Sequence, residues 1–147
     1  MPNLKLSNIA LLEFHDAVLD ELIWQQRGAC ALVFQHIAVY KFVAHEHYEV
    51  WSCSATLELA GVSHLEVDGA FSQQDWVSDL EAFDASGAKF QDIDLTSKQA
   101  VSKVMVKFTN GALITIELTS ANVATLEPIT KLEDWFGPLR TIAAIDN

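Results

Sequence analysis

The sequence is poor in several features that mark large classes of proteins. Only two of its 147 residues are cysteines, Cys30 and Cys53, and both lie in apolar segments. One such pair is weak evidence for a disulfide, so we expect reduced thiols and a cytoplasmic location. No apolar run approaches the roughly 20 residues of a membrane-spanning helix, and the opening MPNLKLSN lacks the apolar core of a secretory signal. We therefore expect no membrane association.

Basic residues are also scarce. Nine lysines and arginines stand against 20 aspartates and glutamates, which gives a net charge of −11, and no three basic residues are clustered. Because nucleic-acid binding needs a basic patch that displaces counterions from phosphates, we expect no nucleic-acid partner. Acidity of this degree favours solubility and suits a basic protein as a partner.

Familiar catalytic signatures are missing. The sequence has neither a glycine-rich phosphate loop nor a G-x-S-x-G nucleophile elbow. The strongest metal candidate is the set His45, His47 and Glu49, which share one face if the segment is a strand. Two histidines and a carboxylate can hold zinc. The alternative is a solvated polar connection between strands, with no cofactor.

A second polar candidate is the adjacent pair His15 and Asp16. A carboxylate beside a histidine can orient a general base. Neighbouring residues on a strand point to opposite faces, however, so on a strand these two side chains would not meet. The alternative, which we favour, is a turn or bulge in which Asp16 bonds backbone amides.

What the sequence does have is a strand of nearly perfect alternation at residues 49–62, EVWSCSATLELAGV. One parity is apolar and should face the core, and the other is polar. We expect this segment to be the central strand of an antiparallel sheet, ended by Gly61. The side chains expected on the buried face are Trp51, Cys53, Ala55, Leu57 and Leu59.

The segments around the central strand are less uniform. Residues 9–25 fit a helix or a strand, and the turn signal at 26–28 favours a hairpin with the run 29–43. That run is rich in β-branched and aromatic residues and apolar on both parities. It is therefore covered on both faces or changes face at a bulge. Further strands are expected at 64–67, 76–84, 90–95 and 122–126.

The last hairpin joins strands expected at 101–109 and 112–118. A two-residue Asn110-Gly111 turn would set the apolar face of each strand against the polar face of the other. A three-residue loop, 109–111, instead pairs Val106 with Ile114 and Val104 with Ile116. We therefore predict a type I turn with Gly111 in the left-handed region, as a G1 bulge.

The C-terminal region carries helix signals. Pro128 should stop the strand at 122–126, and Thr130 and Glu133 fit a capping box. Gly137-Pro138 is a stop signal, so a short helix is expected at 131–136. Together the patterns predict a mainly β protein: one domain over 1–147, an antiparallel β-sandwich or open barrel with one short C-terminal helix.

A family resemblance rests on the segment Phe14-His15-Asp16-Ala17 with Leu19, the run ALVFQHIAVY and the later EVWS. These segments resemble small bacterial β-rich domains with an F-H-D-(S/A)-x-L opening and no assigned function, some of which are grouped with contact-toxin immunity proteins. The similarity is confined to about the first 60 residues. It implies a strand over 12–24, and it assigns no catalytic residue.

We therefore expect a small binding or interaction protein, with an immunity-like inhibitor of a basic toxin as its most specific form. The alternative is a metal-dependent or His/Asp-based enzyme acting on a small molecule. We also expect a homodimer, because residues 29–43 are apolar on both parities. In addition, four tryptophans and eight phenylalanines can exceed what one small core hides.

Overall fold

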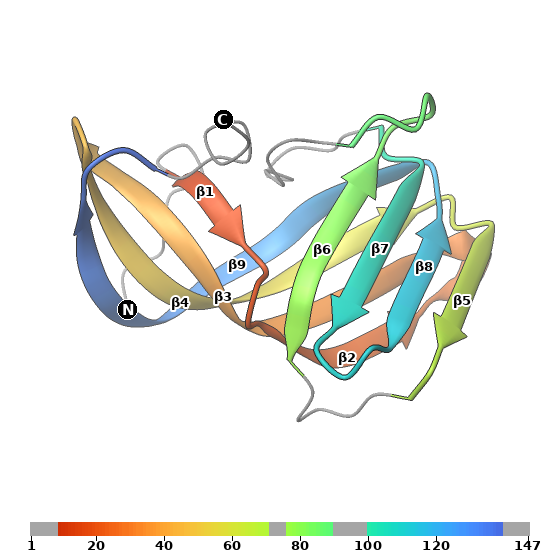
Figure 1. Cartoon of the computed structure of the whole chain (residues 1–147). Helices are drawn as coiled ribbons and strands as arrows, with labels where there is room; N and C mark the ends of the chain where they lie inside the picture. Colours follow the sequence, from red (N-terminus) through yellow and green to blue (C-terminus); the bar gives the residue numbers. More distant parts are fainter. Residues whose placement is uncertain (1–8, 71–75, 90–99, 140–147) are drawn as a thin grey trace.

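The computed structural model of the chain describes residues 9–70, 76–89 and 100–139. These residues form nine strands in two antiparallel sheets that face each other (Figure 1). The first sheet contains β1 (Ile9–Glu13), β2 (Val18–Trp24), β3 (Cys30–Ala44), β4 (His47–Ala60) and β9 (Ser120–Phe136). The second contains β5 (His64–Asp68), β6 (Val77–Phe83), β7 (Lys103–Phe108) and β8 (Leu113–Glu117).

The predicted mainly β class is confirmed. β1 and β2 both pair with one edge of β3, and β4 and then β9 follow on its other edge. The segment predicted as the central strand is therefore an inner strand, and residues 9–25 are strands on either side of a turn. β2 and β3 join through a single 3-10 turn, Gln26–Gly28, as expected. The strand expected at 90–95 lies outside the described residues.

The core lies between the two sheets. Side chains from one face of β3 and β4 meet those from one face of β7 and β8 there, and the side chains that meet are buried. The alternation predicted for β4 holds from Cys53 to Leu59. Trp51 continues the same face but is only half-buried, because it packs against the edge of the core. The central buried side chains are Leu32, Phe34, Ile37, Leu57, Leu59, Val104, Val106, Ile114 and Ile116.

A bulge explains why β3 is apolar on both parities. The pairing of β3 with β4 shifts between Phe34 and Ile37, where His36 has a φ of 62°. Leu32 and Phe34 point into the core before the bulge, and Ile37 and Val39 point into it afterwards. The bulge thus moves the buried face from even to odd residues.

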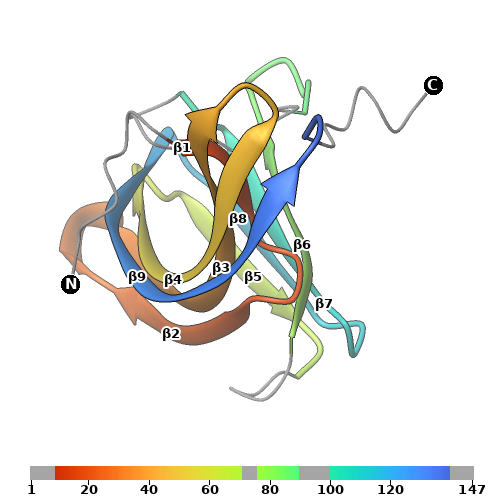
Figure 2. The ribbon, with the colours of Figure 1, turned by 90° about the vertical axis from the view of Figure 1, so that its left-hand side faces the viewer.

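Beyond this bulge the first sheet extends past the second. We call this extension the arm; it comprises residues 9–13, 37–52 and 129–139, and its residues Leu12, Ile37 and Val39, where it joins the rest of the sheet, still belong to the core. Figure 1 shows β1, β3, β4 and β9 continuing beyond β6, and Figure 2 shows β3, β4 and β9 as nested arcs. Val50 is only 3% exposed although its parity is opposite to that of Cys53. The arm therefore buries side chains on the other face of the sheet.

The predicted C-terminal helix is wrong, and so is the expected end of a strand at Pro128. Both segments belong to β9, which runs without a break to Phe136. β9 pairs only with β4 among the described strands, and an edge strand tolerates proline. A six-residue helix is too short to stand alone, whereas β4 offers a long ladder of backbone hydrogen bonds. Gly137 ends the strand, as the stop signal indicated.

The predicted β7–β8 hairpin is confirmed. Val106 pairs with Ile114 and Val104 with Ile116, as the three-residue loop requires. The Gly111 amide donates to the Phe108 carbonyl at 3.0 Å, and Gly111 has a φ of 94°.

In the described ranges, no helix is long and apolar enough to cross a membrane.

Candidate functional site

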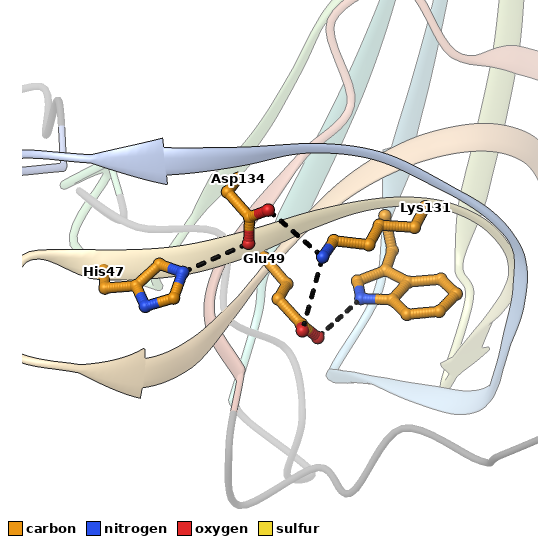
Figure 3. Close-up of polar contacts among 5 residues, drawn as sticks. His47, Glu49, Lys131 and Asp134 are labelled. Atoms are coloured by element: carbon orange, nitrogen blue, oxygen red, sulfur yellow. Dashed lines mark hydrogen bonds and ion pairs between the residues drawn. The ribbon is translucent and has the colours of Figure 1, made fainter.

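The structure gathers a polar cluster on the arm, from strands far apart in sequence (Figure 3). His47 and Glu49 are two residues apart on β4 and therefore share one face of the strand. The adjacent strand β9 supplies Lys131 and Asp134. The His47 Nε2–H donates to Asp134 Oδ1 at 3.1 Å, and Lys131 Nζ donates to Asp134 Oδ2 at 3.2 Å. Lys131 Nζ also lies 3.6 Å from Glu49 Oε2. The lysine thus bridges two carboxylates.

Aromatic rings border this cluster. The Phe136 ring stacks on His47, with centroids 4.4 Å apart and an interplanar angle of 17°. The Trp51 indole N–H donates to Glu49 Oε1 at 3.2 Å. Each carboxylate therefore has two partners, and the rings confine the cluster at both ends.

The electrostatics of the cluster favour the charged forms of Asp134 and Lys131. Hydrogen bonds from His47 and Lys131 lower the pKa of the Asp134 carboxyl below its ordinary value. The hydrogen bond to Asp134, and the charges of Asp134 and Glu49, raise the pKa of Lys131. All four polar side chains are partly exposed, so each ion pair contributes little stability. The cluster orients side chains of β4 and β9 on the surface of the arm.

The metal set predicted from sequence does not assemble. The structure places His47 and Glu49 in the cluster, but His45 lies in the β3–β4 turn with its side chain 94% exposed. Its Nε2 lies 3.9 Å from Glu46 Oε1. The alternation of β4 starts only at His47, so it does not extend to His45. Among the described residues, no three His, Cys, Asp or Glu side chains converge as metal ligands.

His15 and Asp16 lie in a turn between β1 and β2, as the favoured alternative required, but the Asp16 carboxylate lies near the His15 ring and not on backbone amides. Asp16 has a φ of 69°, and the turn brings its Oδ1 to 3.6 Å from His15 Nε2. The His15 Nδ1–H donates to the Ser78 carbonyl at 2.7 Å. The Asp16 amide donates to the Val77 carbonyl at 2.8 Å. The pair therefore joins the first sheet to β6.

His36 and the two cysteines also carry groups with potential chemistry, and their surroundings are structural. His36 is exposed, and its Nδ1 lies 3.3 Å from the hydroxyl of the buried Ser52. Cys30 and Cys53 are free and buried. Burial raises the pKa of the Cys53 thiol to about 12. A thiol in this state is a poor nucleophile.

Exposed apolar side chains on the arm are the feature that sequence reasoning missed. Phe136 is 70% exposed, Leu132 57%, Phe42 50% and Val43 45%. Leu132 and the similarly exposed Ile129 fall where the β9 register shifts against β4, so each is the extra residue of a bulge. Alternation cannot reveal such positions, because a bulge breaks the period on which alternation depends.

Comparison with protein families, curated proteins and solved structures finds no match to this chain.

Proposed function

We propose that the protein is a small binding protein that contacts a basic protein partner through the arm. The observation that carries this proposal is the set of exposed apolar side chains that the arm carries: Phe42, Val43, Ile129, Leu132 and Phe136. Single exposed apolar residues are ordinary, but several on one projecting element are typical of an interaction surface.

The charge of the arm suggests the chemistry of the partner. Its only basic side chains are Lys41 and Lys131, and these are outnumbered by five carboxylates, those of Glu13, Glu46, Glu49, Glu133 and Asp134. An excess of acidic over basic side chains on the same element as apolar anchors favours a basic partner, because complementary potentials speed encounter and reject acidic proteins. Occlusion of a basic toxin, the immunity-like role that the sequence resemblance implies, is one function of this kind.

A matched pair of variants tests the proposal. Val43 on the arm and Val67 on β5 are the same residue type with the same exposure, 45%. Wild type, Val43→Ser and Val67→Ser are used to capture proteins from the source cells, and each captured protein is then purified. We expect a basic protein whose affinity falls at least about tenfold in Val43→Ser and stays at the wild-type value in Val67→Ser. Equal binding by all three proteins would remove the arm as the contact surface.

A second copy of the chain is the competing occupant of the arm. The homodimer expected from sequence stays a prediction, although the bulge at His36 already accounts for part of its basis. Light scattering of the same three proteins separates the cases. A mass of two chains in wild type and Val67→Ser, but one chain in Val43→Ser, would make the arm a dimer interface instead.

A further inference from the structure

We infer that a hollow at the end of the first sheet binds a small molecule that carries a guanidinium group. β4 begins in the arm at His47 and ends at the hollow with Ala60, so the hollow lies at the end of the strand opposite the arm. None of its lining residues belongs to the arm. The inference therefore goes beyond the proposed function and does not depend on it.

The pairing of β4 with β9 brings the central residues of the hollow together. Glu58 of β4 pairs with Asn122 of β9, so their side chains are neighbours on one face of the sheet. Ala60 lies two residues from Glu58 and therefore shares that face. Leu59, between them, is buried in the core. The hollow therefore lies on the face of the first sheet that is turned away from the second sheet.

The β2–β3 turn supplies the rest of the hollow, and small side chains provide its space. The backbone amide of Gln25 donates to the Ala29 carbonyl at 2.9 Å, and both residues line the hollow together with Ala60. The hollow has a volume of about 190 Å³ and is partly open to solvent. A cavity of about 150 Å³ accommodates benzene, whereas sites for drug-sized ligands are commonly about 300–1,000 Å³. The space therefore suits a molecule about the size of benzene.

The polar side chains of the lining are free to bind a ligand. Across the part of the chain that the structure describes, Gln25, Glu58 and Asn122 have no side-chain hydrogen bond or ion pair. A ligand would therefore break no existing contact of these groups. A preformed hollow with a few convergent polar groups is the usual form of a small-molecule site.

The lining selects a cation. Glu58 is its only charged side chain among the described residues, so an anion would meet like charge there. A guanidinium group can bind a carboxylate through two parallel hydrogen bonds, and it has more N–H donors than an ammonium group. Its remaining donors match the carboxamide oxygens of Gln25 and Asn122. Ala29 and Ala60 offer apolar contact for a short alkyl group.

NMR titration with two matched small molecules tests the hollow. Ethylguanidinium and the neutral ethylurea have nearly the same shape, and each has as many non-hydrogen atoms as benzene. The side-chain amide signals of Asn122 report binding and are assigned with Asn122→Ser. We expect ethylguanidinium to shift these signals saturably at millimolar concentration, and ethylurea to bind about fivefold more weakly. Absence of a saturable shift, or equal binding of the two molecules, would overturn the inference in the wild-type protein itself.

Three variants locate the binding. Glu58→Gln should weaken binding of ethylguanidinium to the level of ethylurea, because it removes the charge and keeps the shape. Its control is Glu127→Gln, which changes an exposed carboxylate of β9 that does not line the hollow, and should bind like wild type. Ala60→Val should weaken binding of both molecules, because the larger side chain fills the space. Equal binding by Glu58→Gln and Glu127→Gln would place the cation elsewhere and overturn the inference.

A third ligand distinguishes a free small molecule from a side chain of a protein partner. N-acetylarginine amide carries the same guanidinium group on a peptide backbone. Binding no tighter than that of ethylguanidinium supports a free molecule as the occupant, whereas tighter binding would assign the hollow to an arginine of a partner instead. Val43→Ser, on the arm, should bind ethylguanidinium like wild type, so loss of the protein partner in that variant and loss of the small cation in Glu58→Gln are separate results.

Discussion

Gly111 is the residue at which local sequence and backbone geometry are most tightly linked. Its φ of 94° lies in the left-handed region, and nothing lies within 4 Å of an added β-carbon. Backbone strain is therefore the main cost expected for Gly111→Ala, about 1–2 kcal/mol. Urea unfolding measures this loss. Gly111→Asn should lose less, because asparagine adopts this conformation more readily, and an alanine variant as stable as wild type would contradict the turn.

His15 should make stability depend on pH. Its hydrogen bond to the Ser78 carbonyl, with the charges of Asp16, Glu13 and Asp79, raises the pKa of His15 above 6.5 despite partial burial. A histidine whose pKa is higher in the folded than in the unfolded protein stabilises the fold when it is protonated. This stabilisation is complete below the unfolded pKa and is lost as the pH rises through the folded pKa. His15→Gln should therefore lose more free energy of unfolding near pH 5.5 than near pH 8.5.

NMR titration checks the same residue directly. The His15 ring signals should titrate with a midpoint above 6.5, and Asp16→Asn should lower that midpoint. A midpoint at or below 6.5 would show that the hydrogen bond to β6 does not hold in solution.

Residue-level prediction succeeded where local rules apply and failed where the backbone departs from them. The dipeptide Asn110-Gly111 indicates a turn, and the apolar pattern of the two flanking strands then determines the length of the loop. His36 also has a positive φ, but it is not a glycine and its neighbours do not indicate a bulge. Tertiary pairing imposes this conformation, so the face change in β3 could be stated only as one of two alternatives.

At the scale of elements, one substitution in β9 tests whether this segment is a strand or the helix predicted from sequence. Thr130 would be the N-cap of the predicted helix, and loss of a cap costs about 1 kcal/mol. In the structure Thr130 is an exposed strand residue paired with Ser52. Thr130→Val should therefore leave thermal stability unchanged or raise it, because valine favours strands. Thr125→Val, on the same exposed strand, is the control, and a loss confined to Thr130→Val would support the helix.

The helix signals in this segment were real, and the tertiary structure overrode them. A capping box followed by Leu132, Trp135 and Phe136 fits one helical turn. This local signal contains no information about β4, the strand with which the segment pairs in the structure. β4 is long enough to pair with the whole of β9, and three shifts of register adjust the ladder. Such bulges bend an edge strand and protect it from further pairing, as does Pro128.

At the scale of the whole molecule, the sequence defined the two sheets better than the site. His47 and Glu49 were identified because they alternate within one strand. Asp134 was not, because it lies 87 residues from its partner His47 and only the β4–β9 pairing brings them together. No local pattern shows that the second sheet covers only part of the first, so the arm and its exposed side chains appear only in the structure.

The difference between the covered part of the first sheet and the arm predicts two levels of local stability. Residues 30–34 and 55–59 pair with each other and pack on the second sheet, and most of their side chains are buried. Residues 39–43 and 47–51 belong to the same two strands, but most of their side chains are only partly buried or are exposed. Opening the arm therefore exposes less apolar surface than opening the core, and should cost less free energy.

Hydrogen exchange measured by mass spectrometry checks this difference. Amides of 39–43 and 47–51 should exchange faster than those of 30–34 and 55–59, although all lie in one ladder. The comparison is internal, since each strand supplies both a covered and an arm segment. A partner that binds the arm should slow exchange in the arm segments first. Uniform exchange along β3 and β4 in the free protein would mean that the arm unfolds only with the core and is as stable as the core.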